Sequence, residues 1–278
     1  MTSPQSSPSA SSELLDALRG WFATVGDVVV AFSGGADSAL VAAVAAEQLG
    51  DRALAVTAVS PSLAGREADD CALLAREWGL NWTTVTTDEM ESAAYRANDA
   101  DRCFHCKTAL MDALAPVLAE RSAVPVLGVN LDDLADHRPG QRAAIAAGAR
   151  FPLVETGFTK ASVREVSRLL SLRTWDKPAA ACLASRIEHG RAVSVTLLAR
   201  VDRAEDLLVG LGLGQLRVRH HGDTARIEVE PVDFARVIES REVVVDGLQR
   251  LGYRYVTLDL AGFRSGSMNP EPGAEDRT

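Results

Sequence analysis

Residues 28–38 read VVVAFSGGADS, and this stretch sets the architecture of the first half of the chain. The β-branched run at its start predicts a buried strand, and the Ala- and Leu-rich residues that follow predict a helix. Between them, Gly34 and Gly35 allow the backbone to approach a phosphate closely, and the free amides at the helix start complete an anion site. The order of strand, Gly-rich loop and helix therefore predicts a phosphate-binding loop, with an ordinary helix-capping turn as the alternative.

Polar side chains in this loop favour phosphate binding. Ser33 and Ser38 place hydroxyl donors on either side of the glycines, and Asp37 lies in the first turn of the predicted helix. The loop contains neither G-x-x-x-x-G-K-[ST] nor G-x-G-x-x-G. It is therefore neither a Walker A loop nor a dinucleotide fingerprint.

Outward from the loop, short β-branched runs alternate with helical stretches. Strands are predicted at residues 28–32, 53–59, 81–87, 124–130 and 151–155, with helices at residues 36–50 and 66–79. This alternation is typical of the α/β class, a doubly wound parallel sheet with helices on both faces. Ligands of such sheets bind beyond the carboxyl ends of the strands, so the loops after Phe32, Val59 and Asn130 are expected to share one cleft.

The last third of the chain has a different pattern. After about Arg191 a long amphipathic stretch is followed by alternating runs at residues 215–221, 225–230 and 255–260. This pattern predicts a smaller C-terminal α+β domain. We therefore expect a disordered tail at residues 1–12, a nucleotide-binding α/β domain at residues 13–190, the α+β domain at residues 191–268 and a second disordered tail at residues 269–278.

Further polar residues are expected at the phosphate site. Asn130 ends a predicted strand, and Asp132 and Asp133 follow it as a carboxylate pair that can hold Mg²⁺ against bound phosphates. Lys160 lies at the start of a predicted helix, where an ammonium is unfavourable unless it meets an anion. We expect Lys160 to bind phosphate. A solvated turn and a solvated lysine are the respective alternatives.

Composition limits the classes of partner. The 278 residues carry a formal charge of −9 with no block of like charge, which argues against a nucleic-acid substrate and favours a small molecule. Of the 29 basic residues only Lys107, Lys160 and Lys177 are lysines, and each lies beside a motif. No stretch has the apolar length to cross a bilayer, and the first residues do not resemble a signal peptide, so a cytoplasmic protein without a membrane partner is expected.

Four cysteines in a cytoplasmic chain indicate metal, cluster or catalytic use rather than disulfides. Cys103 and Cys106 form a C-x-x-C pair, and Cys182 lies far along the chain. The spacing leaves three possibilities open: an iron-sulfur cluster with one open iron, a zinc site completed by a histidine such as His105, or a redox dithiol. Cys71 lies among Ala and Leu in a predicted helix and is expected in the core.

The loop resembles the PP-loop of the ATP pyrophosphatase superfamily, whose adenine nucleotide alpha hydrolase-like domains bind the pyrophosphate part of ATP and transfer AMP to an acceptor oxygen. Over nearly the whole chain between the tails, the segments NLDDLADHRPG, KPAAACLASRIEHG and GFRSGSMN are similar to the LarE family. These are sulfur transferases that make the thiocarboxylates of the nickel-pincer nucleotide of lactate racemase. The resemblance implies ATP and Mg²⁺ as cofactors and a small nucleotide as substrate.

The resemblance also implies roles for the cysteines. In that family the cysteine of the CLASR segment is the sulfur source, which corresponds to Cys182. Some members give up the sulfur of this cysteine itself, whereas members with an added C-x-x-C pair bind a [4Fe-4S] cluster through all three cysteines. Cys103, Cys106 and Cys182 are therefore the expected catalytic residues and cluster ligands. The implied reaction is adenylation of pyridinium-3,5-biscarboxylic acid mononucleotide, loss of pyrophosphate, and displacement of AMP by sulfur.

Arginines are the expected ligands of the substrate phosphate. A strand period of two puts Arg217 and Arg219 on one face, where the family uses two arginines for this purpose, and Arg186 is a further candidate. His220 and His221 are expected at the surface. The family forms hexamers, so a homo-oligomer is implied, with the second domain as its assembly element. The competing functions are a PP-loop tRNA thiolase, an amide-forming PP-loop synthetase with structural zinc, and a non-catalytic ATP-binding sensor.

Overall fold

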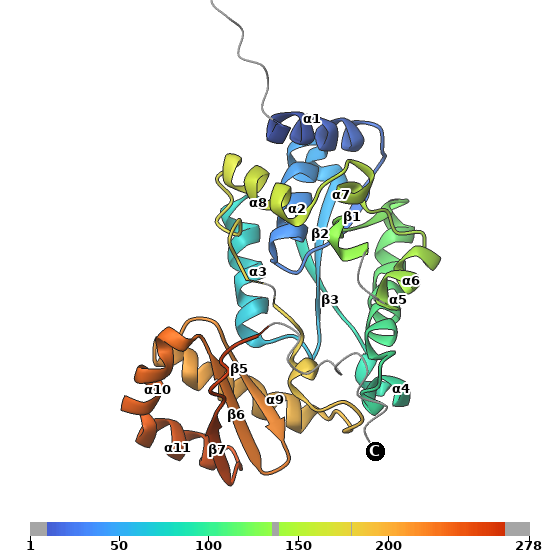
Figure 1. The fold of residues 1–278 in the computed structure, drawn as a ribbon. Helices are drawn as coiled ribbons and strands as arrows, with labels where there is room; N and C mark the ends of the chain where they lie inside the picture. The colour runs from blue at the N-terminus through green and yellow to red at the C-terminus, as the bar shows by residue number, and fades with distance from the viewer. Residues whose placement is uncertain (1–9, 135–138, 179, 265–278) are drawn as a thin grey trace, which may run out of the picture. The chain divides into compact units, whose positions relative to one another are not determined.

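The computed structural model describes residues 10–134, 139–178 and 180–264, which form two compact units (Figure 1). The phosphate-loop unit consists of the chain up to Ser60 together with Gly65–Glu89 and Cys103–Ala180. The C-terminal unit consists of Pro61–Ala64, Met90–Arg102 and the chain from Ala181 onward. Pro61–Ala64, Met90–Arg102 and residues 181–190 of the C-terminal unit therefore come from within the range predicted for the first domain.

A four-stranded sheet forms the centre of the phosphate-loop unit. Its strands are β1 (Val28–Ala31), β2 (Ala53–Val59), β3 (Trp82–Thr86) and β4 (Val124–Leu127), in the order β3-β2-β1-β4. All neighbouring pairs are parallel, which confirms the predicted α/β class. Because β1 has a neighbour on each side, the loop that follows it emerges from the middle of the carboxyl edge of the sheet.

Helices cover both faces of this sheet. Val28 and Val30 pack in one buried cluster with side chains from α1 (Ala10–Ala23), α2 (Ala36–Leu49), α3 (Gly65–Glu77) and α8 (Lys160–Leu169). Val29 points to the opposite face, because strand side chains alternate, and packs with α5 (Arg102–Arg121) and α6 (Pro139–Ala146). The doubly wound arrangement follows, since both faces of the strands are apolar and both must be buried.

The fifth strand predicted at residues 151–155 is wrong. The chain makes a single parallel bridge between Val126 and Arg150 and then turns into the short helix α7 (Pro152–Glu155). Pro152 lies at the first helical position, where its fixed φ favours the turn and its missing amide costs no hydrogen bond. Glu155 then accepts hydrogen bonds from Trp21 at 2.8 Å and from Arg150 at 2.9 Å, which stabilise the helical turn.

Helix α1 begins at Ala10, inside the predicted disordered tail of residues 1–12. Leu15, Leu18 and Phe22 are buried in the core, and the Ser11 hydroxyl donates to Glu165 of α8 at 3.0 Å. Tertiary packing of one apolar side therefore stabilises the helix from its first turn, which local composition alone does not reveal. The tail predicted at residues 269–278 lies outside the described residues.

The C-terminal unit contains a three-stranded sheet and its own core. Strand β5 (Leu216–His221) pairs antiparallel with β6 (Thr224–Val229), which pairs in parallel with β7 (Tyr255–Leu258). Helices α9 (Val195–Gly210), α10 (Phe234–Glu239) and α11 (Arg241–Arg250) pack on this sheet and contribute apolar side chains to its core. This architecture confirms the predicted C-terminal α+β fold. Among the described residues, no helix combines the length and apolar character needed to cross a membrane.

Candidate active site

The phosphate loop begins directly after β1. Gly35 is the N-cap of α2, and no side chain caps the helix there. The Ser38 hydroxyl folds back into the loop, where it accepts a hydrogen bond from the Ser33 amide at 3.2 Å and donates to the Gly35 carbonyl at 3.1 Å. The loop thus holds its own shape and leaves the first amides of α2 directed at an anion site.

Gly34 and Gly128 lie where neighbouring atoms come too close for a residue with a side chain. Gly34 has a φ of +68°, and a Cβ there would lie 3.0 Å from the Cys71 sulfur and 3.6 Å from the Lys177 nitrogen. Gly128 follows β4 and faces the first turn of α2, where a Cβ would lie 2.6 Å from the Ser38 backbone nitrogen. The loops after β1 and β4 therefore meet at a separation that no other residue type permits. The segment after Val59 belongs to the C-terminal unit, so its place in the expected cleft stays a prediction.

Asp37 is held by residues from two other segments. Its carboxylate forms an ion pair with the Lys160 ammonium and accepts a hydrogen bond from the Asn130 side-chain amide at 2.9 Å. Asn130 is fully buried, whereas the Lys160 side chain is 36% exposed. The fold brings together three residues predicted for the nucleotide site, and Lys160 remains open to a ligand. As predicted, Lys160 is the first residue of a helix, α8.

Asp132 and Asp133, predicted as magnesium ligands, shape the loop after β4. The Asp132 carboxylate accepts from the Lys160 backbone amide at 2.6 Å, and the Asp133 carboxylate accepts from the Asn130 amide at 3.2 Å. Within the described part of the chain, no three His, Cys, Asp or Glu side chains gather as a metal site. Magnesium that arrives with ATP needs only one or two carboxylates besides the phosphates, so this donor set fits an ATP-bound ion.

Lys177 is held beside Gly34 by helix α3. Its ammonium donates to Glu67 at 2.8 Å and to Asp70 at 2.7 Å. Burial alone would lower the pKa of Lys177, but the two carboxylates raise it above its ordinary value, so the positive charge is retained. Cys71, on the same helix, is buried as predicted, and this burial raises the pKa of its thiol.

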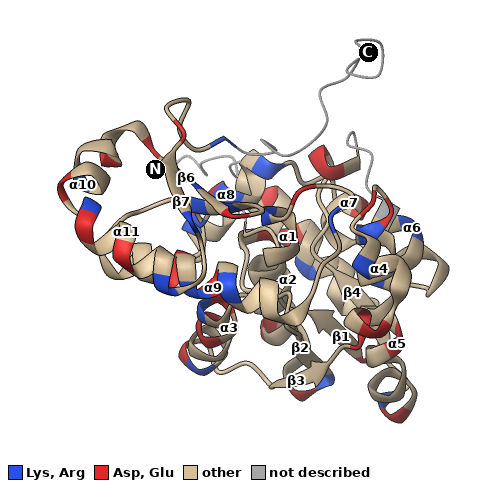
Figure 2. Cartoon of the chain, turned by 90° about the horizontal axis from the view of Figure 1, so that it is seen from below, with Lys and Arg blue, Asp and Glu red and all other residues tan. Residues whose placement is uncertain are grey.

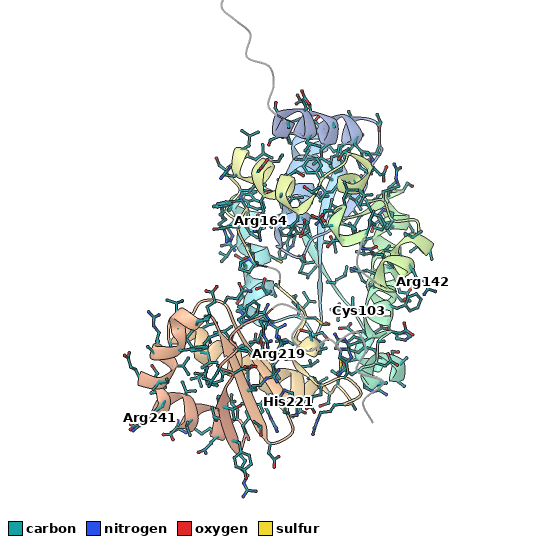
Figure 3. The ribbon with its side chains drawn as sticks, in the orientation of Figure 1. Cys103, Arg142, Arg164, Arg219, His221 and Arg241 are labelled. Carbon is teal, nitrogen blue, oxygen red and sulfur yellow. The ribbon has the colours of Figure 1, made fainter. Side chains whose placement is uncertain are left out.

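Cys103 lies near the start of α5 (Figure 3), and Cys106 follows it one turn later on the same helix. Neither forms a disulfide; Cys103 is exposed and Cys106 is partly exposed. Their i, i+3 spacing puts both thiols on one side of the helix. Lys107 follows them, and the removal of its ammonium from water lowers the pKa of Lys107. The two thiols are therefore accessible and can share a ligand.

Cys182 lies in the C-terminal unit, before the 3₁₀ turn Leu183–Arg186. The Arg186 side chain donates to the carbonyl of Ala181 at 2.6 Å and to the carbonyl of Cys182 at 3.0 Å. Its other two nitrogens donate to both carboxylate oxygens of the fully buried Glu205 at 2.9 and 3.1 Å. The ion pair fixes the guanidinium, which in turn fixes the backbone of Cys182.

Asn98 and Arg102, which the sequence patterns did not single out, bind the segment after Cys182. Arg102 donates to the Ala184 carbonyl at 3.0 Å and to the Asn98 side chain, and Asn98 donates to the Glu188 carbonyl at 2.7 Å. Asn98 has a φ of +58°, a conformation that Asn adopts more readily than most residues. The sequence feature that could have indicated a role for Arg102 is its position directly before the C-x-x-C pair.

The arginines predicted to bind the substrate phosphate have different environments. Arg219 (Figure 3) is buried and donates to Glu228 at 2.8 and 3.0 Å. Arg217 is partly exposed, and its guanidinium lies 5.1 Å from the ring centroid of Phe263. Arg186 is 2% exposed. Arg217 is thus the most accessible of the three, whereas the other two are engaged with buried glutamates.

The surface position predicted for the histidines is wrong for His220. Its side chain is 3% exposed, and its ring centroid lies 5.7 Å from that of Tyr253. The strand period of two puts His220 on the same face as Val218, which belongs to the core. Burial lowers the pKa of His220 to about 4. His221 is partly buried, and its Nδ1 bonds to Glu188.

The donor set of the thiols suits an iron-sulfur cluster. Cys103, Cys106 and Cys182 form no disulfide and are at least partly exposed, in contrast to the buried Cys71. Two of them share one side of a helix, and the backbone of the third is fixed by Arg186. Thiolates of this kind are the usual protein ligands of such clusters.

Comparison with known proteins gives one family match and several relatives. The family model for NAD synthase matches residues 13–111, which contain the phosphate loop. An uncharacterized protein of Synechocystis sp. is 44% identical over 258 residues, which cover 92% of this chain and 96% of that protein. The pyridinium-3,5-bisthiocarboxylic acid mononucleotide synthase of Lactiplantibacillus plantarum is 39% identical over 244 residues, which cover 87% of this chain and 88% of that synthase. An uncharacterized protein of Methanocaldococcus jannaschii is 26% identical over 239 residues, 86% of this chain and 91% of that protein.

Proposed function

The chain belongs to the LarE family of pyridinium-3,5-bisthiocarboxylic acid mononucleotide synthases, and we propose that it converts the carboxylates of pyridinium-3,5-biscarboxylic acid mononucleotide to thiocarboxylates. It is an ATP-dependent sulfurtransferase that adenylates its substrate. The product would serve the nickel-pincer nucleotide of lactate racemase. The observation that most directly supports this proposal is the partly exposed Cys182 on a backbone held by Arg186.

The phosphate loop carries out the adenylation. A carboxylate oxygen of the substrate attacks the α-phosphorus of ATP, the bond from that phosphorus to the bridging oxygen breaks, and pyrophosphate leaves. The amides at the start of α2, with Ser33, Gly34 and Ser38, bind the departing phosphates. Lys160 exchanges its Asp37 partner for the negative charge that grows on pyrophosphate. Mg²⁺ bound beside Asp132 and Asp133 would neutralise part of the same charge.

The thiol site carries out the sulfur transfer. Sulfur attacks the carbonyl carbon of the acyl adenylate, the bond from that carbon to the AMP oxygen breaks, and AMP leaves with the electron pair. A [4Fe-4S] cluster on Cys103, Cys106 and Cys182 would leave one iron open and supply the sulfur as sulfide. The hydrogen bond from Arg102 to Ala184 helps to fix the segment that follows Cys182.

The substrate phosphate is assigned to Arg217, the one partly exposed residue among the three predicted arginines. Arg186 supports the site by holding the Cys182 backbone. Arg219 lies on the same strand face as Arg217. The family's hexameric assembly suggests a homo-oligomer in which this site is shared between subunits.

Anaerobic purification followed by metal analysis and turnover tests the proposal. We expect about four irons per chain with matching sulfide, and release of AMP and pyrophosphate when Mg-ATP and the dicarboxylate mononucleotide are added. Bound zinc with AMP release would instead favour the amide-forming synthetase. The absence of both iron and AMP release would refute the proposed reaction.

A comparison of two cysteine variants separates the routes of sulfur delivery. Cys103→Ala should lose iron and, with sulfide supplied, all turnover beyond the first, whereas Cys182→Ala should lose all thiocarboxylate. Pyrophosphate release should persist in both because the phosphate loop is intact. If Cys103→Ala matches wild type in a single turnover, and wild type itself stops after one, then the sulfur of Cys182 is consumed and the cluster proposal fails.

A further inference from the structure

A groove in the C-terminal unit runs between α9 and the end of α11. Its volume is about 430 Å³, within the range of about 300–1,000 Å³ found for small-molecule sites. Its lining includes the apolar side chains of Val195, Ala199 and Leu251 and the guanidiniums of Arg200, Arg203 and Arg250. No residue assigned to the reaction above lines this groove.

The positive charge of the groove comes from three arginines on α9 and α11. Within residues 10–134, 139–178 and 180–264, none of its three arginines forms an ion pair. In the same unit, by contrast, Arg186, Arg219 and Arg226 each pair with a buried glutamate. Like charges around one concave surface repel one another, and this repulsion is relieved when an anion binds. Figure 2 marks the basic positions of α9 in blue.

The Arg200 side chain packs against Tyr253 and Gly252. Its guanidinium lies 5.6 Å from the ring centroid of Tyr253, a cation–π distance, and its Nη2 would lie 3.4 Å from a Cβ at Gly252. Tyr253 is 2% exposed and packs against the buried His220. A guanidinium fixed on a buried ring loses little freedom when it binds a ligand, which favours affinity.

We propose that this groove is a binding site for a mononucleotide, separate from the phosphate loop. The guanidiniums bind the dianionic phosphate, for which their planar forks are suited, and the apolar lining contacts the base and ribose. The volume matches a molecule of nucleotide size. The apolar lining gives a nucleotide an advantage over inorganic phosphate.

Titration of methyl-labelled protein with AMP tests the proposal at the level of residues. Methyl resonances of Val195 and Leu251 report on the groove itself, because both residues line it. We expect saturable shifts of both resonances with AMP, and weaker binding of inorganic phosphate and of adenosine. Arg203→Gln and Arg250→Gln should each weaken AMP binding by about tenfold or more, as expected for a charge-assisted hydrogen bond.

The matched control is Arg241→Gln, because Arg241 lies on the same helix as Arg250 with its side chain 76% exposed and outside the groove. It should leave AMP binding unchanged. Equal affinity for phosphate and AMP, or no methyl shift at millimolar AMP, would overturn the proposal. The remaining alternative is that the groove is a subunit interface, which sedimentation tests. If Arg203→Gln and Arg250→Gln dissociate an oligomer and AMP produces no methyl shift, the groove is such an interface and the proposal is wrong.

Discussion

The Arg186 guanidinium and the Glu205 carboxylate form a two-point ion pair inside the C-terminal unit, with nitrogen–oxygen distances of 2.9 and 3.1 Å. Neither side chain is more than 2% exposed. A buried pair of this kind adds little net stability, because the loss of hydration offsets the attraction. The ion pair instead positions the Cys182 backbone, because the third nitrogen of the same guanidinium donates to the carbonyl of Cys182.

Glu205→Leu should destabilise the C-terminal unit by about 3–5 kcal/mol, because it leaves the Arg186 charge buried without a partner. The double variant Arg186→Met with Glu205→Leu should recover most of this loss, yet remain unable to transfer sulfur to the acyl adenylate. Urea unfolding and thiocarboxylate formation are the two measurements. Wild-type sulfur transfer by the double variant would show that the Cys182 backbone needs no such support.

Lys160→Gln should slow pyrophosphate release by about 10²–10³-fold, as loss of a donor to a developing oxyanion does in other enzymes. The fold should be unaffected, because the side chain is partly exposed and Thr159 caps α8. Arg164→Gln, on an exposed position of the same helix (Figure 3), is the control and should keep the wild-type rate. A coupled assay measures the rate of pyrophosphate release by each variant. Equal rates for the two variants would show that Lys160 has no part in the reaction.

Gly128→Ala should destabilise the phosphate-loop unit by about 1–3 kcal/mol and weaken ATP binding, because the new Cβ forces β4 away from the start of α2. Gly26→Ala, where a Cβ meets nothing within 4 Å, is the matched control and should change stability by at most about 0.5 kcal/mol. Thermal unfolding with and without Mg-ATP measures both effects. Similar behaviour of the two variants would contradict the close contact described between the loops.

His220 should make the protein less stable in mild acid. Burial, with the charges of Arg191 and Arg200, lowers the pKa of His220 to about 4, whereas its ordinary value is 6.5. Between these values the unfolded chain binds a proton that the folded chain does not, so the free energy of unfolding falls as the pH falls from 6.5 towards 4. The loss due to His220 between pH 7 and pH 5 should be about 2 kcal/mol.

His220→Phe isolates this contribution, because a phenyl ring can occupy the buried position but cannot titrate. Urea unfolding at pH 7 and pH 5 should show a smaller loss in the variant than in wild type by about the amount given above. An identical pH dependence in the two proteins would mean that folding leaves the pKa of His220 at its ordinary value, and would contradict the prediction.

Local sequence was sufficient to predict most of the phosphate-loop unit. Strands, helices and the loop at residues 33–38 follow from the spacing of apolar residues and glycines, which acts over a few neighbouring positions. The fifth strand was mistaken because FPLVE has the composition of a buried strand, and the helical turn depends on Pro152 and on contacts from Trp21 and Arg150. Composition cannot supply such contacts between distant segments.

For the site, the chain's motifs identified the chemical groups: the loop amides, Asp37, Lys160 and the three cysteines. Only the tertiary structure decided which groups are fixed and which are open. It pairs Lys160 with Asp37 and buries His220 in the core. It also buries Arg186 and Arg219 in ion pairs with glutamates. The physical reason is that chemical identity belongs to one residue, whereas burial and charge pairing depend on partners from other segments, which only the folded chain brings together.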